Sequence, residues 1–154
     1  MSFEAEYKKL KKKYKQLPDI SWIKSRIRIE YEEGGLPAIE QLRIAIDHKL
    51  TFFARNIIEP IVSTNESFCC WFERKMINES EKKVLFENYK KMMSLLWRHT
   101  NLNLVSSEKS QADWIADVKK YLDANEKEME RIFDKISVGW KEYKKIDSET
   151  AYHG

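Results

Sequence analysis

The chain has 154 residues, of which 42% are apolar and 34% are charged, with only four glycines and three prolines. These proportions exclude a disordered chain and a turn-rich sheet fold, and they favour one soluble helical domain with its own core. The formal net charge of +3 is too small to indicate nucleic-acid binding by the chain as a whole.

The first predicted helix, over residues 2–16, combines an apolar stripe with a basic face, and Ser2 is its expected N-cap. The stripe repeats at alternating spacings of four and three residues, which is typical of an amphipathic helix. It consists of Phe3, Tyr7, Leu10, Tyr14 and Leu17. The basic positions are Lys8, Lys9, Lys11, Lys12, Lys13 and Lys15. Residues 1–17 carry +4, so the rest of the chain sums to −1 and the positive excess is local to this helix.

The segment after Pro18, from Ile20 to Glu33, has a mixed pattern. Some of its apolar residues recur at helical spacing, whereas others alternate as in an extended strand, so we expect irregular structure here. Three basic residues alternate in the same segment: Lys24, Arg26 and Arg28. If this stretch is extended, the three share one face close to the first helix.

A second long helix is predicted from Pro37 to Pro60. Proline is favoured in the first turn of a helix, and a later proline is expected to end it. Its apolar residues are Ile39, Leu42, Ile46, Leu50, Phe53 and Ile57. Further apolar neighbours widen this stripe beyond one narrow face, so the helix is expected to be central in the fold.

Two more helices follow a polar loop over residues 63–66. The first is short and covers residues 68–76. The next begins with Asn78, since Glu81 three residues later completes a capping box, and its apolar pattern fades near Asn101.

The last predicted helix carries a long apolar seam whose spacing alternates between three and four residues. The seam consists of Ile115, Val118, Leu122, Asn125, Met129, Ile132, Ile136, Gly139 and Tyr143. Such a repeat implies a helix of about 35 residues and about 50 Å. Asn125 is expected to fix the register between helices, and Gly139 to allow either a close approach or a bend.

The expected fold is therefore an all-α helical bundle of four main helices plus one short helix, with a long C-terminal helix. It forms a single domain over residues 1–146, and residues 147–154 are expected to be a flexible tail. The two cysteines, Cys69 and Cys70, are adjacent and seldom pair at that spacing, which favours a reducing, cytoplasmic setting. We expect neither a signal peptide nor a membrane span, because no apolar run is long enough.

No motif for metal binding or catalysis stands out, so we expect no metal, no cofactor and no enzyme activity. The histidines are His48, His99 and His153, and none lies in the Glu-x-x-His pairs of di-iron bundles. Glu30-x-x-Glu33 has the spacing of a magnesium-binding pair of helical NTP pyrophosphatases, but no later Glu-x-x-Asp follows.

A cysteine nucleophile stays open in principle, because Cys69 or Cys70 could meet His48 or His99 in space. The simpler interpretation makes at least one cysteine a small apolar core residue, since Trp71 and Phe72 follow directly.

The basic helix allows three interpretations. Its stripe could dock on the bundle and leave the lysines solvated, its lysines could contact nucleic-acid phosphates, or it could lie on a membrane surface, for which it lacks tryptophan. Lysine without arginine favours contact with the backbone over reading of bases. The candidate surface for RNA or another acidic partner comprises Lys8, Lys9, Lys11, Lys12, Lys13, Lys15, Lys24, Arg26 and Arg28.

Two lysine-rich stretches resemble a family of small helical archaeal proteins of unassigned function. They are MSFEAEYKKLKKKYKQLPD over residues 1–19 and SEKKVLFENYKKMM over residues 80–93. The resemblance covers about a fifth of the chain and implies no catalytic or binding residue.

These observations favour a non-catalytic interaction module that uses its lysine-rich helix to contact an acidic partner, with RNA or a ribonucleoprotein ahead of protein. One alternative is a structural protein that self-associates through the long C-terminal helix. Another is a small helical enzyme that uses Glu30, Glu33 or His48.

Overall fold

The computed structural model describes residues 2–30, 34–63 and 70–143, and all regular structure in these residues is helical. The all-α class is therefore confirmed. The elements are α1 (Phe3–Lys13), α2 (Ile20–Arg26), α3 (Ala38–Thr51), the π-helical η1 (Phe52–Ile58), α4 (Glu59–Val62), α5 (Trp71–Met76), α6 (Glu79–Leu104) and α7 (Glu108–Glu142). None of these described helices has the length and apolar character needed to cross a membrane.

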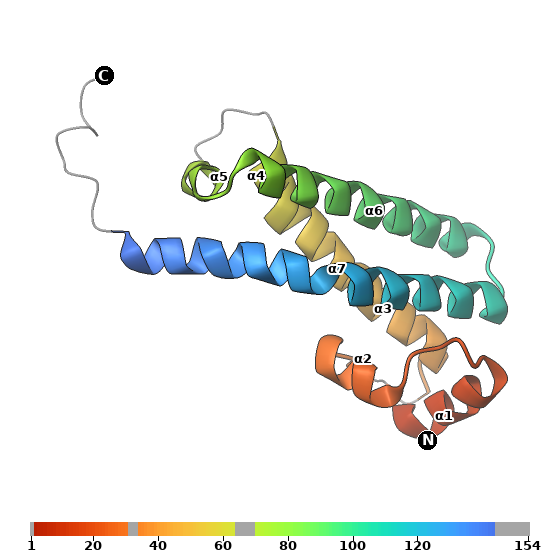
Figure 1. The fold of residues 1–154 in the computed structure, drawn as a ribbon. Coiled ribbons are helices and arrows are strands. Elements are labelled where there is room, and N and C mark those ends of the chain that lie inside the picture. Colours follow the sequence, from red (N-terminus) through yellow and green to blue (C-terminus); the bar gives the residue numbers. More distant parts are fainter. Residues whose placement is uncertain (1, 31–33, 64–69, 144–154) are drawn as a thin grey trace.

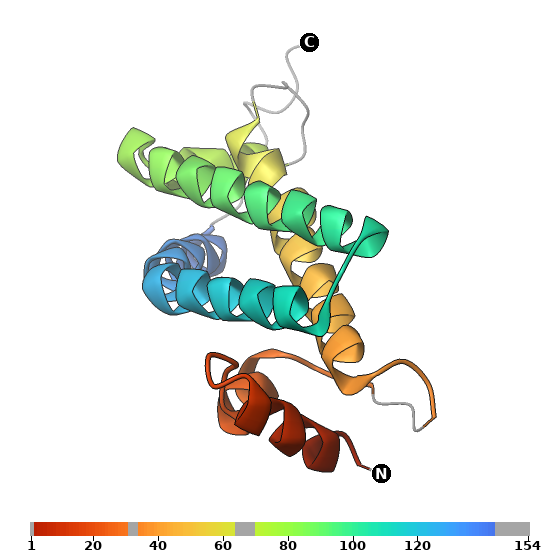
Figure 2. The same cartoon turned by 90° about the vertical axis from the view of Figure 1, so that its right-hand side faces the viewer.

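The helices form a layered bundle around α7. Figure 1 shows α6 and α7 side by side, with α3 crossing them and α1 and α2 beneath the N-terminal half of α7. Seen from the side, α6, α7 and the α1–α2 pair follow one another as layers (Figure 2). Leu42 of α3, Leu85 of α6 and Ile115 of α7 meet in the single core and are fully buried.

The predicted start of α6 and the predicted length of α7 agree well with the structure. Asn78 and Glu81 form the predicted capping box at the start of α6, which continues to Leu104, three residues beyond the expected end. A second capping box, between Ser107 and Ser110, starts α7. The 35 residues of α7 confirm the length predicted from the seam.

The apolar seam of α7 packs against other helices of the same chain. Val118 and Ile132 have no exposed surface, and α3 and α6 both pack against α7. Asn125 accepts a hydrogen bond from Lys91 of α6, at 3.3 Å, so it does contact the neighbouring helix. Gly139 serves close approach, since a Cβ atom there would lie 2.3 Å from the sulfur of Met76 in α5.

The prediction of irregular structure over Ile20–Glu33 is wrong for its first half, because residues 20–26 form α2. This adds a helix to the expected set, so the described residues contain six when α3, η1 and α4 are counted as one continuous helix. A seven-residue helix is too short for periodicity to distinguish it from a strand. Tertiary contacts stabilise it: Ile23 is buried, and the Trp22 indole donates to Asp123 of α7 at 2.8 Å.

Pro60 does not end the second long helix, which continues to Val62. Before the proline, the chain changes to π-helical hydrogen bonding, and the Glu59 N–H bonds to the Ala54 carbonyl five residues earlier. Pro60, which has no N–H to donate, then lies in the first turn of α4, directly after the π-helical segment.

Some predicted helix boundaries differ from those in the structure, and others fall on residues that the structure does not describe. The first helix ends at Lys13, three residues before the expected end, and its N-cap residue Ser2 makes no side-chain capping bond. The start of the short helix at Phe68 and Cys69, and the tail over residues 147–154, lie outside the described residues.

We expect Ile132→Ala to lower the free energy of unfolding by about 2–5 kcal/mol, because it leaves a cavity at a fully buried position. Val138→Ala on the same helix is the matched control. Its side chain is 48% exposed, so its effect should stay within about 0.5 kcal/mol. Urea unfolding followed by circular dichroism measures both, and equal effects would contradict an internal seam.

Candidate basic interface

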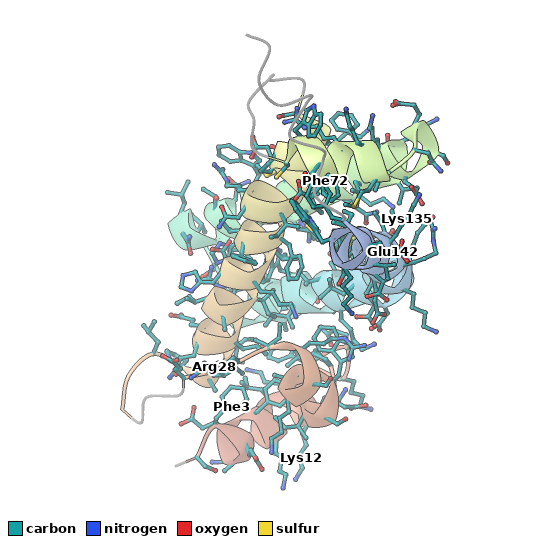
Figure 3. The ribbon with its side chains drawn as sticks, turned by 90° about the vertical axis from the view of Figure 1, so that its left-hand side faces the viewer. Phe3, Lys12, Arg28, Phe72, Lys135 and Glu142 are labelled. Carbon is teal, nitrogen blue, oxygen red and sulfur yellow. The ribbon has the colours of Figure 1, made fainter. Side chains whose placement is uncertain are left out.

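Helix α1 docks on the bundle through its apolar stripe. Tyr7 is 1% exposed, its hydroxyl donates to the Pro18 carbonyl at 2.7 Å, and Phe3 stacks on its ring. Lys8, Lys9 and Lys12 therefore lie on the opposite face. Figure 3 shows Lys12 on the outer side of α1, pointing away from the other helices.

Five of the nine predicted interface residues form ion pairs within the chain. The pairs are Lys11–Asp19, Lys13–Glu108, Lys24–Glu4, Arg26–Glu126 and Arg28–Glu30. Those of Lys13 and Arg26, both with closest atoms 2.5 Å apart, join α1 and α2 to α7. These two side chains position helices and are not available to a partner without loss of that contact.

The paired cations lower the pKa of two of these carboxylates. The hydrogen bond from Lys13 lowers the pKa of Glu108, and the hydrogen bonds from Arg26 lower the pKa of Glu126. Each carboxylate therefore stays ionised, and the α1–α2 pair remains tied to α7 at neutral pH.

A smaller cluster of lysines is exposed on α1 and in the turn after it. Lys8 and Lys12 are four residues apart in α1 and so lie on one side of it, Lys15 lies in the turn that follows the helix, and all three are exposed. No ion pair of theirs occurs among the residues that the structure describes. Lys9 is exposed beside them. We call Lys8, Lys12 and Lys15 the lysine face.

Two of the remaining predicted residues, Arg26 and Arg28, line cavities. Arg26 lines a cavity between α2, α3 and α7, and Arg28 lines another cavity beside His48. The expectation that Lys24, Arg26 and Arg28 share an extended face fails for Lys24 and Arg26, because these two lie in α2.

Two residues of the enzyme alternative do come together. Glu30 and His48 line the same cavity of about 420 Å³, together with Arg28. The Glu30 side chain is 84% exposed and its nearest cation, Arg28, is 3.7 Å away. Glu33 lies outside the described residues. This arrangement is a solvated surface depression without the burial that shapes catalytic carboxylates.

The described part of the chain gives little support for a metal site or for a cysteine nucleophile. It contains no group of three or more His, Cys, Asp or Glu side chains placed to hold a metal ion. Cys70 is half-buried, has a left-handed backbone with φ of 64°, and lines a cavity with aromatic residues such as Trp140. Neither His48 nor His99 lines that cavity. Cys69 is not described.

A polar cluster in which Arg43, His99 and Gln111 are buried joins α3, α6 and α7, and sequence reasoning did not find it. His99 of α6 contacts Asp47 of α3, with 2.8 Å between Nδ1 and Oδ1. Arg43 of α3 donates to Asn103 at 2.7 Å and to Gln111 of α7 at 3.3 Å. The partners are up to 68 residues apart, so no local spacing could reveal them.

The His99 imidazole has a structural role. Nδ1 donates to Asp47, so Nε2 is the unprotonated nitrogen of the neutral ring. Nε2 is buried without a hydrogen-bond partner in the described residues, and the ring lies 5.2 Å from that of Trp114. An aspartate–histidine pair can orient a catalytic base, but no hydroxyl or thiol among the described residues hydrogen-bonds to Nε2.

Burial lowers the pKa of His99 more than the Asp47 carboxylate raises it, and Arg43 and His48 act in the same direction as burial. Neutral His99 therefore stabilises the fold above the unfolded-state pKa of about 6.5, and this contribution is lost as the pH falls below that value.

We expect His99→Gln to reduce the loss of unfolding free energy between about pH 7 and about pH 5, because the variant has no buried imidazole to protonate. Urea unfolding at both pH values measures the difference. His48→Gln, at an exposed histidine of α3 whose charge is the smallest of the influences on His99, should keep most of the pH dependence. An identical pH dependence in wild type and His99→Gln would contradict the assignment.

Comparison with protein families, curated proteins and solved structures finds no match to this chain. The resemblance to small helical archaeal proteins therefore stays a prediction from sequence, and the function has to be argued from the site itself.

Proposed function

We propose that this protein is a non-catalytic binding module whose lysine face contacts the phosphate backbone of RNA. The proposal includes a cytoplasmic location, where adjacent cysteines stay reduced. The observation that carries it is the lysine face: exposed Lys8 and Lys12 on one side of α1, whose other side is docked, and exposed Lys15 in the turn that follows.

Docking of α1 supports this function by fixing the lysines in space. Tyr7 and Leu17 are each 1% exposed, so α1 is held by buried contacts and not only by charge. A partner then meets a preformed row of cations and orders only the lysine side chains. Each phosphate neutralised by a lysine releases condensed counterions, which favours binding at low salt.

The chemistry of lysine also sets the expected specificity. Its ammonium group is a point charge, and it lacks the planar fork with which arginine reads guanine. Contacts through the lysine face are therefore directed at the backbone and do not select a sequence.

Self-association through the seam of α7 has less support as an alternative. Ile115, Val118 and Ile132 are already fully buried within one chain. Exposing them to a second copy would require α3 or α6 to leave, which would cost the core.

We expect a fluorescein-labelled single-stranded RNA to bind and to lose about twentyfold in affinity between about 50 mM and about 200 mM salt, as three phosphate contacts imply. Fluorescence anisotropy measures this. The variant Lys8→Gln/Lys12→Gln/Lys15→Gln should abolish binding in this range.

The matched control is Lys109→Gln/Lys120→Gln/Lys127→Gln, which removes the same charge from exposed positions of α7. It should retain most of the affinity. Equal loss in both variants would mean that total charge and not the lysine face is responsible. Binding that does not depend on salt, or tighter binding of polyglutamate than of RNA, would overturn the choice of RNA.

A further inference from the structure

A cavity of about 540 Å³ lies where α2, the α3–η1 junction and α7 meet. The α1–α2 pair lies beneath only the N-terminal half of α7 (Figure 1). Ser25 and Arg26, at the end of α2, line the cavity. Its floor is apolar and consists of Leu50, Met92, Leu122 and Met129, which are all buried. The volume lies within the usual range for small-molecule sites.

Two aromatic rings form the walls. Phe53, at the start of η1, and Phe133 of α7 are stacked with centroids 6.3 Å apart and an interplanar angle of 26°. π-helical turns are rare and often occur at functional sites. Here the change to π-helical geometry begins beside the cavity, at the turn that carries Phe53.

The charged rim has an acidic excess. Its cations are Arg26 and Lys49, and its anions are Glu126, Glu130 and Asp134, which gives a formal charge of −1. Arg26 and Glu126 neutralise each other through two hydrogen bonds, of 3.0 and 2.5 Å. Glu130 and Asp134 are exposed and form no ion pair within the described residues.

Lys49 is poorly suited to hold an anion. Its ammonium group donates to the Arg26 carbonyl at 2.6 Å and lies 5.9 Å from the centre of the Phe53 ring. Burial lowers the pKa of Lys49, and the charge of Arg26 acts in the same direction. The two carboxylates one turn apart on α7 are therefore the groups that a ligand charge would meet.

We propose that this cavity binds a small organic cation with an apolar body and one ammonium group. The body lies against Phe53, Phe133 and Met129, and the ammonium group lies at Glu130 and Asp134. Apolar walls supply the affinity, and the acidic rim selects the charge. This site is separate from the lysine face and does not depend on RNA binding.

The test compares three probes that share one body and differ in the head group: 4-phenylbutylamine, 4-phenylbutanol and 4-phenylbutyrate. Isothermal titration calorimetry on the full chain should give the tightest binding for the amine and the weakest for the carboxylate. We expect a preference of about threefold to tenfold for the amine over the alcohol, as is usual for exposed charge pairs and cation–π contacts.

The variant Glu130→Gln/Asp134→Asn should remove that preference and leave alcohol binding unchanged. Its matched control is Glu128→Gln/Glu142→Gln, at exposed carboxylates of α7 that do not line the cavity. The control should keep the preference for the amine.

Methyl NMR of labelled methionines locates the bound probe independently of any variant. The Met92 and Met129 methyl signals should shift on titration with 4-phenylbutylamine, whereas Met76, which lies against Gly139, should not. Tighter binding of the carboxylate would overturn the proposed charge selection. Equal binding of all three probes would do the same, and unchanged Met92 and Met129 signals would overturn the site.

Discussion

The whole fold depends on covering one long helix. Helix α7 is 35 residues long, which corresponds to about 50 Å, and its apolar seam must be covered along most of that length. Helix α6 lies along it, α3 crosses it, the α1–α2 pair covers the N-terminal half and α5 packs near the end. The positions of the other helices therefore follow from the need to bury several separate stretches of α7.

Charged contacts tie α1, α2 and α6 to α7. Glu81 is the clearest case, since it completes the capping box of α6 and also accepts hydrogen bonds from Lys135 at 2.7 Å and Arg131 at 3.2 Å. Lys135, followed by the Asn78 N–H, lowers the pKa of Glu81, so this buried carboxylate stays ionised. One side chain thus couples the start of α6 to the second half of α7.

Local features were predictable from the sequence, and long-range partners were not. The capping box at Asn78, the length of α7 and the stripe of α1 depend on residues a few positions apart. The basic face of the first helix was also predictable from the sequence. Which lysines remain available depends on acids far along the chain, as with Lys13 and Glu108. The Asp47–His99 contact and the short helix α2 likewise depend on tertiary packing, which single-sequence periodicity does not report.

The π-helical turn has a consequence for how this chain can change in length. Such a turn accommodates one extra residue while the flanking α-helical turns keep their faces. Removing a residue from 52–58 could therefore be absorbed, whereas the same deletion in α7 would rotate half of the seam out of the core. Pro60 fits this location, because a proline directly after a π-helical turn interrupts hydrogen bonding that is already irregular. Changes in length are therefore expected within η1 and disfavoured along the covered part of α7.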